Sequence, residues 1–203
     1  MSGFAVTRWW LVRHAPVNNP DGVIYGRTDL PAIFEDDGLL KRVSAALPDD
    51  AIRVASNLAR SIDTLKRLSL VQRDQLDIKV IPALAEQDFG VWEGQRWADI
   101  PAEQARMFWD DYASSVPPGG ESFNQLAGRV GEAFHALTTE YAGRNIVAVL
   151  HGGSIRAILA SILGTPPAAS LSFDVAPLAI TRVDYLDAPD NPGWRIGSVN
   201  LVV

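Results

Sequence analysis

The pair Arg13-His14 combines two groups that together can handle a phosphate ester. A histidine that is neutral near pH 7 can attack an electrophile, and a neighbouring guanidinium can hold a phosphate through paired hydrogen bonds. The pair follows the apolar and aromatic stretch 8–12 and precedes the turn-rich segment 15–22, so we expect it at the end of a strand. Taken alone, such a dipeptide more often only ends a strand in solvent.

The rest of the chain alternates between strand and helix patterns. Short apolar runs predict strands, whereas apolar residues at helical spacing predict helices. Segment 95–120 is expected to be a helical excursion, or lid, rich in aromatic residues. The expected strands are 8–14, 52–56, 78–84 and 145–150, with two more near 171–186 and 194–202, and the expected helices are 39–47, 58–68, 123–141 and 155–163. This order predicts an α/β fold, a three-layer α/β/α sandwich around a mostly parallel sheet, with residues 1–203 as one domain.

Three more polar side chains resemble Arg13-His14 in their placement at the end of an expected strand. Arg60, Glu86 and His151 each lie at or just beyond the carboxyl end of a separate expected strand. In a parallel sheet these ends meet at one edge, where open α/β sheets bind their ligands. The sequence therefore predicts that these groups form one site.

These residues, with their neighbours, resemble motifs of the histidine phosphatase superfamily, in the branch that contains cofactor-dependent phosphoglycerate mutases and related phosphatases. Arg13-His14 resembles its Arg-His-Gly signature, with Ala15 in place of the glycine. The other similar segments, in chain order, are Ser56 to Arg60 and Thr64, Leu84-Ala85-Glu86 with 89–94, Gly119 to Ser122, and Val149 to Arg156. The resemblance covers nearly the whole chain and implies the fold and chemistry of that family.

The resemblance implies a phosphohistidine mechanism. His14 would attack phosphorus through one ring nitrogen, while a hydrogen bond to the other nitrogen fixes the tautomer. Glu86 would protonate the leaving oxygen and then deprotonate the attacking water, and Glu93 is interpreted as structural. The groups expected to hold the phosphoryl oxygens are Arg13, Arg60, His151 and the backbone N–H of Gly152. No metal or cofactor is expected, because three cationic groups neutralise the phosphate, and His151 is expected to become more basic once the anion binds.

The loop after His14 departs from the family pattern. Asn18 or Asn19 is expected to replace a missing phosphate-binding asparagine, and the sequence leaves the choice open. Segment 25–31 resembles a loop of phosphatases that act on α-ribazole phosphate, and there Gly26 could offer its N–H to the substrate. Segment 95–120 contains Arg96 and Arg106 but also several acidic residues, which favours a phosphatase over a mutase. A mutase and a weakly active phospho-ligand binding protein stay open as alternatives.

The composition and net charge of the chain exclude several classes of chemistry and of binding partner. The 203 residues are 47% hydrophobic and 21% charged, which is typical of a globular protein, and there is no cysteine for disulfides or thiolate chemistry. A net charge of −6 argues against nucleic acid or an anionic membrane as partner. The expected partner is a small-molecule phosphate ester, in a cytoplasmic protein with no membrane contact, and a homodimer is left open.

Overall fold

A six-stranded sheet forms the centre of the computed structural model, which describes residues 4–72 and 77–203. The strand order is β3-β2-β4-β1-β5-β6. Neighbours in the series β3, β2, β4 and β1 run parallel, whereas β5 is antiparallel to both β1 and β6. The strands are β1 (Ala5–Arg13), β2 (Ile52–Ala55), β3 (Ile78–Val80), β4 (Asn145–Leu150), β5 (Ile180–Asp187) and β6 (Gly193–Leu201). The expected mostly parallel sheet is confirmed.

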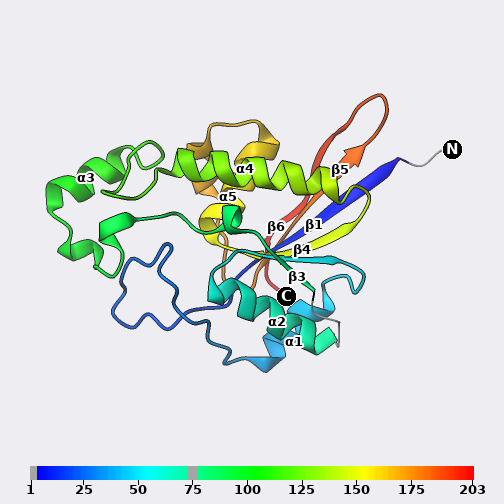
Figure 1. The fold of residues 1–203 in the computed structure, drawn as a ribbon, viewed down its shortest axis with the longest axis horizontal. Coiled ribbons are helices and arrows are strands. Elements are labelled where there is room, and N and C mark those ends of the chain that lie inside the picture. Colours follow the sequence, from blue (N-terminus) through cyan, green and yellow to red (C-terminus); the bar gives the residue numbers. More distant parts are fainter. Residues whose placement is uncertain (1–3, 73–76) are drawn as a thin grey trace.

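Helices cover both faces of this sheet (Figure 1). Helices α1 (Asp37–Ala45) and α2 (Ala59–Gln72) lie on one face, and α4 (Phe123–Glu140) and α5 (Gly152–Leu163) lie on the other. Strand β1 contributes side chains to the hydrophobic cores on both faces of the sheet, because alternate side chains point to opposite faces. Trp9 and Leu11 belong to the core under α4 and α5, while Val12 belongs to the core under α1 and α2. The expected three-layer sandwich is therefore present.

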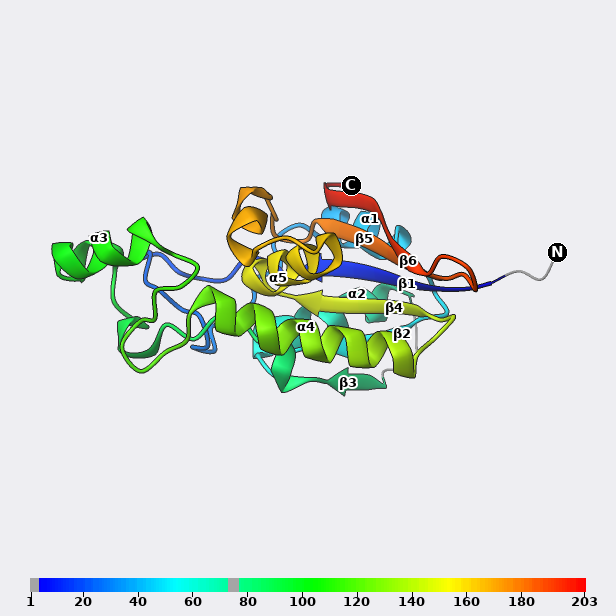
Figure 2. The same cartoon turned by 90° about the horizontal axis from the view of Figure 1, so that it is seen from above.

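The segment after β3 extends beyond the carboxyl edge of the sheet, together with loop 15–35 (Figure 2). It contains helix α3 (Ala102–Asp110) and three short 3₁₀ turns, η1 (Pro82–Leu84), η2 (Gly90–Trp92) and η3 (Trp97–Asp99). A separate hydrophobic cluster of Ile24, Trp92, Ile100 and Phe108 packs this excursion against the loop. Aromatic rings meet edge-on or stacked throughout the cluster, a geometry that adds to the energy of apolar burial.

Helix α4 begins where its sequence predicts. The Ser122 side chain accepts the N–H of Gln125, and the Gln125 side chain accepts the N–H of Ser122, which together form the expected capping box. Helix α5 begins at Gly152, earlier than the expected Ile155, and ends at Gly164 in the left-handed conformation with φ of 62°. The early start matters, because it places the helix N-terminus directly after His151.

Two expected strands are shorter in the structure. The third strand was expected over 78–84 but ends at Val80, because Pro82 opens a 3₁₀ turn and has no N–H for a strand ladder. The strand expected from 171 begins only at Ile180. Residues Pro167–Ser172 form the 3₁₀ segment η4, and Leu178 has a positive φ of 62°, outside the extended conformation of regular strands. Within the described ranges, no helix is both long and apolar enough to cross a membrane.

Candidate active site

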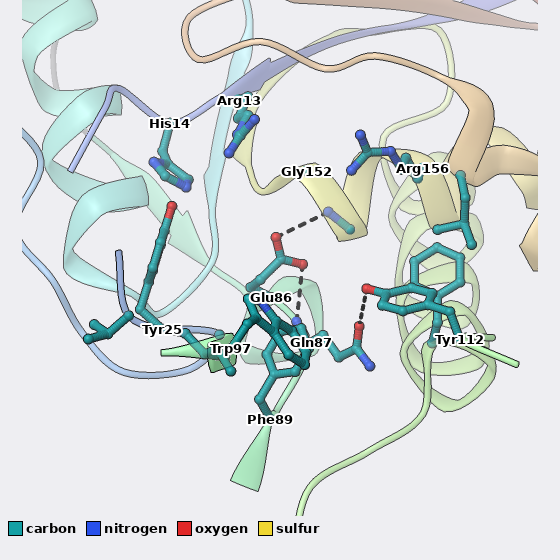
Figure 3. Close-up of a pocket in the computed structure, with 16 residues that line it drawn as sticks. Arg13, His14, Tyr25, Glu86, Gln87, Phe89, Trp97, Tyr112, Gly152 and Arg156 are labelled. Atoms are coloured by element: carbon teal, nitrogen blue, oxygen red, sulfur yellow. Dashed lines mark hydrogen bonds between the residues drawn. The ribbon is translucent and has the colours of Figure 1, made fainter. Parts of the chain in front are cut away.

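A pocket of about 250 Å³ opens at the carboxyl edge of the sheet (Figure 3). Arg13, His14, Glu86 and Gly152 line it together, although they are widely separated in sequence. The remaining lining residues are Val23, Ile24, Tyr25, Gly26, Gln87, Phe89, Trp97, Tyr112, Phe123, Gly153, Arg156 and Leu171. The structure thus brings together the ends of β1 and β4 and the segment after β3, as a parallel sheet predicts.

His14 is a buried, neutral histidine with one ring nitrogen available. Its side chain is nearly covered, and its Nδ1 lies 2.6 Å from the carbonyl oxygen of Ala15. A carbonyl only accepts, so Nδ1 carries the proton and Nε2 keeps its lone pair. Burial above all, together with the nearby charges of Arg60 and Arg13, lowers the pKa of His14 from 6.5 to about 3, against the opposing effect of the Ala15 hydrogen bond. His14 is therefore neutral over the physiological pH range, with an unprotonated Nε2.

His151 lies beside His14, with ring centroids 5.2 Å apart. Its Nε2 is 2.7 Å from the hydroxyl oxygen of Ser56 at the end of β2, whereas its buried Nδ1 has no hydrogen-bond partner among the described residues. Full burial, followed by the charges of His14 and Arg60, lowers the pKa of His151 well below its ordinary value. In the ligand-free protein His151 is neutral; the greater basicity expected from its sequence position applies to the anion-bound state.

Arg13 and Arg60 have no carboxylate partner within hydrogen-bond distance in the described part of the chain. Arg13 donates from Nη1 to the carbonyl of Val175 at 2.6 Å, and its Nε has no partner. Arg60 is fully buried and donates from its two Nη atoms to the carbonyls of Gly26 and Thr28, at 2.5 and 2.8 Å, while its Nε is also unpartnered. Burial lowers the pKa of Arg60. Both guanidiniums are thus held by neutral carbonyls and keep their charge available to an anion.

Arg60 also has a role in holding a loop, which its position in the sequence did not indicate. It holds the loop 26–28 and also faces the Tyr25 ring, whose centroid is 5.2 Å from the guanidinium carbon. Gly26 lines the pocket as expected, and a Cβ there would collide with the carbonyl of Gln87. Only glycine fits at this close approach of two loops.

Glu86 projects into the pocket between Gly152 and Gln87 (Figure 3). Its Oε2 accepts the N–H of Gly153 at 3.1 Å, and its Oε1 accepts the N–H of Gln87 at 3.1 Å. Gly153 lies in the first turn of α5, where the backbone N–H groups are free to bind an acceptor. The helix N-terminus therefore holds the carboxylate at the pocket.

Other residues singled out in the sequence lie elsewhere. Asn18 is exposed and does not line the pocket. Asn19 closes a turn, because its side chain exchanges hydrogen bonds with the backbone of Val23 at 2.9 and 3.0 Å. Glu93 accepts the backbone N–H groups of Arg27, Thr28 and Phe89, so it joins the two loops, in agreement with its structural interpretation.

The pocket also contains residues outside the predicted set of catalytic and phosphate-binding groups. Arg156 lines it, with Nε 2.9 Å from the carbonyl of Phe173 and no acidic partner among the described residues. It lies one helical turn after Gly152, and this i, i+4 spacing could have indicated that both face the site. Tyr112 donates its hydroxyl to Gln87 at 2.8 Å, and burial raises its pKa. Arg129 and Ser154 contact the backbone of the Glu86 segment.

Comparisons with known proteins agree with this geometry. The model of the histidine phosphatase superfamily (branch 1) matches residues 9–200. The adenosylcobalamin/alpha-ribazole phosphatase of Escherichia coli is 32% identical over 176 residues, covering 83% of this chain and 85% of that protein. The glucosyl-3-phosphoglycerate phosphatase of Mycolicibacterium vanbaalenii is 30% identical over 173 residues, covering 79% and 76%.

A solved structure shows the same fold. The crystal structure of the alpha-ribazole phosphatase from Shigella flexneri superimposes with a TM-score of 0.79 at 28% identity, covering 95% of this chain and 96% of that one. The chain belongs to the histidine phosphatase superfamily, branch 1. The two relatives given above, from Escherichia coli and Mycolicibacterium vanbaalenii, are phosphatases, which places the chain in the enzyme class of the phosphomonoester hydrolases.

Proposed function

We propose that this protein hydrolyses the phosphate monoester of a small molecule through a phosphohistidine at His14. The observation that supports this most directly is the 2.6 Å contact between His14 Nδ1 and the carbonyl of Ala15, which leaves Nε2 free and unprotonated. A neutral imidazole of fixed tautomer, in a pocket with guanidiniums and a carboxyl group, has the attributes of an activated nucleophile.

In the first step, His14 Nε2 attacks phosphorus and the bond between phosphorus and the leaving oxygen breaks. Glu86, entering this step protonated, gives its proton to that oxygen, so the product leaves as an alcohol. In the second step, Glu86 takes a proton from water as the water oxygen attacks phosphorus. The phosphorus–nitrogen bond then breaks, and inorganic phosphate and neutral His14 are regenerated.

The chain's own cations stabilise the phosphoryl group in this proposal. Its transition state spreads negative charge over the equatorial oxygens, which fixed donors in a water-poor site stabilise strongly. Arg13 and Arg60 each have an unpartnered Nε, and His151 has an unpartnered Nδ1, all of them buried. The backbone N–H of Gly152, at the N-terminus of α5, is a further donor for the phosphoryl oxygens in this proposal. We therefore expect activity without an added metal ion.

The lid supports hydrolysis over phosphoryl transfer to a sugar acid. Arg96 pairs with Asp99 at 2.8 Å and Arg106 with Asp110 at 3.1 Å, and neither arginine lines the pocket. The lid instead contributes the aromatic rings of Trp97 and Tyr112 to the pocket, and Phe89, which precedes the lid, adds a third. These rings fit a leaving group with an apolar or aromatic face, and a small-molecule ester fits the volume of the pocket.

The test is a panel of phosphate esters assayed for inorganic phosphate in the presence of EDTA. The panel contains α-ribazole phosphate, glucosyl-3-phosphoglycerate, sugar phosphates and nucleotides, and His14→Ala is the control. We expect release from at least one ester, a phosphoenzyme detected by intact mass in wild type, and neither in His14→Ala. Phosphoglycerate interconversion without phosphate release would assign a mutase, and binding without turnover would assign a binding protein.

A further inference from the structure

The backbone that carries Glu86 is held by side chains rather than by regular secondary structure. Four consecutive carbonyl groups, those of residues 83 to 86, accept hydrogen bonds from Arg129 on α4 and Ser154 on α5. Arg129 donates from Nη1 to residues 83 and 85, at 2.9 Å each, and from Nη2 to residue 86 at 2.8 Å. The Ser154 hydroxyl lies 3.0 Å from the carbonyls of residues 84 and 85.

A carboxylate completes the contacts of Arg129. Glu121 accepts from Arg129 Nε at 2.9 Å and from Nη2 at 2.5 Å, so all five N–H groups of the guanidinium have partners. Glu121 also accepts the N–H of Asp88 at 3.0 Å. Burial alone would raise the pKa of Glu121, but the hydrogen bonds from Arg129 and Asp88 hold it below its ordinary value. Glu121 is therefore ionised and fixes Arg129 in one orientation.

These contacts hold the chain both before and after Glu86. Arg129 binds the carbonyls of residues 83, 85 and 86, and Glu121 accepts the N–H of residue 88, whereas Gly153 binds the Glu86 carboxylate itself. A planar guanidinium can bind a carboxylate and several carbonyls at once, which a lysine ammonium cannot do in the same geometry. Displacement of a reacting group by about 1 Å can cost about 100-fold in rate.

We propose that Arg129, fixed by Glu121, is a positioning residue for Glu86: it sets the place of the group that protonates the leaving oxygen. The inference rests on the role of Glu86 in the proposed function. The inference predicts a selective loss of activity. An enzyme with a misplaced acid should fail on substrates with poor leaving groups and still act on substrates with good ones. A purely structural role would reduce both activities alike.

The experiment compares phenyl phosphate with 4-nitrophenyl phosphate, which have similar shapes but differ in their need for a proton at the leaving oxygen. The rate of phenol or nitrophenol release is measured in a single turnover, because that step precedes attack by water. Glu86→Gln is the reference for a missing acid. For Arg129→Lys we expect a loss of about 100-fold on phenyl phosphate and of less than about threefold on 4-nitrophenyl phosphate, within the range of general acid catalysis.

A second variant and a matched control accompany Arg129→Lys. Glu121→Gln keeps an acceptor for Asp88 but removes the charge that fixes Arg129, so it should show the same preference to a smaller extent even if Arg129→Lys fails to fold. Arg144→Gln removes an exposed pair with Asp50, 3.2 Å apart, and should leave both rates unchanged. Circular dichroism and thermal unfolding identify the variants that fold.

The outcomes separate this inference from the proposed function. Equal losses on both substrates, or none, in a folded Arg129→Lys or Glu121→Gln protein would overturn the positioning role while Glu86→Gln shows the selective loss. If Glu86→Gln itself loses both activities equally, Glu86 is not the acid, and the proposed function and the inference fail together.

Discussion

The N–H of Gly153 binds one oxygen of Glu86 at 3.1 Å, and a Cβ on Gly153 would collide with the other oxygen. The glycine thus leaves room for the carboxylate that it binds, and its backbone does not need glycine, since the residue lies inside α5 with no positive φ. The same first turn of α5 offers its N–H groups to the pocket at Gly152. One helix N-terminus therefore serves both the carboxylate and the expected phosphate site.

Gly153→Ala should reduce activity with little effect on stability. The added methyl group displaces the flexible end of the Glu86 side chain, while the helix tolerates alanine well. We expect kcat to fall about 100-fold, the cost of a small misplacement of a reacting group. Gly128→Ala is the matched control, because Gly128 lies in α4 with open space around its Cβ position. It should raise the free energy of unfolding by about 0.5–1 kcal/mol and leave kcat unchanged. Full activity in Gly153→Ala would contradict the placement of Glu86.

Glu86→Gln and Glu93→Gln should fail in different ways. Glu93 accepts hydrogen bonds from three backbone N–H groups and the Thr28 hydroxyl, so an amide there leaves donors facing donors. We expect Glu93→Gln to lose about 1–3 kcal/mol of stability in urea unfolding and to keep turnover within about tenfold. Glu86→Gln should keep its stability and lose at least about 100-fold in turnover. The reverse pattern would make Glu93 the proton donor.

Stability should depend on pH through His14. The folded pKa of about 3 lies below the ordinary 6.5, so between these values the unfolded chain binds a proton that the native protein does not. The free energy of unfolding is thus unaffected above 6.5 and falls as the pH is lowered toward 3, by at most about 1.4 kcal/mol per pH unit. In His14→Asn this contribution is absent, so urea unfolding between about pH 7 and about pH 4.5 should show a shallower decline. Parallel pH curves for the two proteins would rule out a buried neutral His14.

Arg60→Lys should weaken substrate binding and loosen the loop 26–28. A lysine ammonium cannot span the carbonyls of Gly26 and Thr28 and also reach a phosphate. We expect KM to rise about 10–100-fold, the value of a charged hydrogen bond, and the amide of residue 27 to exchange faster with deuterium. Arg67→Lys, on the same helix, changes an exposed pair with Asp37 and a contact with the Phe34 ring, both away from the pocket, and should alter neither quantity. A raised KM without faster exchange would mean that Arg60 does not hold the loop.

The sequence predicts the reactive end of the pocket because that end is determined by topology. A parallel sheet brings strand ends to one edge, so Arg13-His14 after β1, His151 after β4 and the Glu86 segment after β3 had to meet there. The capping box at Ser122 was predictable for a similar reason, since it depends on residues only three apart.

Features that depend on long-range packing were not predictable in this way. Arg129 is the only Arg or Lys in 123–140 and adjoins the apolar stripe, but nothing local shows that it binds three carbonyls from another segment. Asn18 or Asn19 was expected at the phosphate from their place in the chain, yet Asn19 closes a turn and Asn18 is exposed to solvent. Irregular loops have no period from which a side-chain direction can be read.

Backbone pairing between loop 15–35 and the start of the excursion ties both outer walls of the pocket together. Ile24 exchanges hydrogen bonds with Gln95 and Gly94, at 2.8 and 2.7 Å, and its side chain enters the aromatic cluster. Neither segment can be replaced without removing the partner of the other. To transfer the leaving-group preference of one relative to another, both segments would therefore have to be grafted as a pair. The residues at the sheet edge, such as Arg13 and His14, would stay the same.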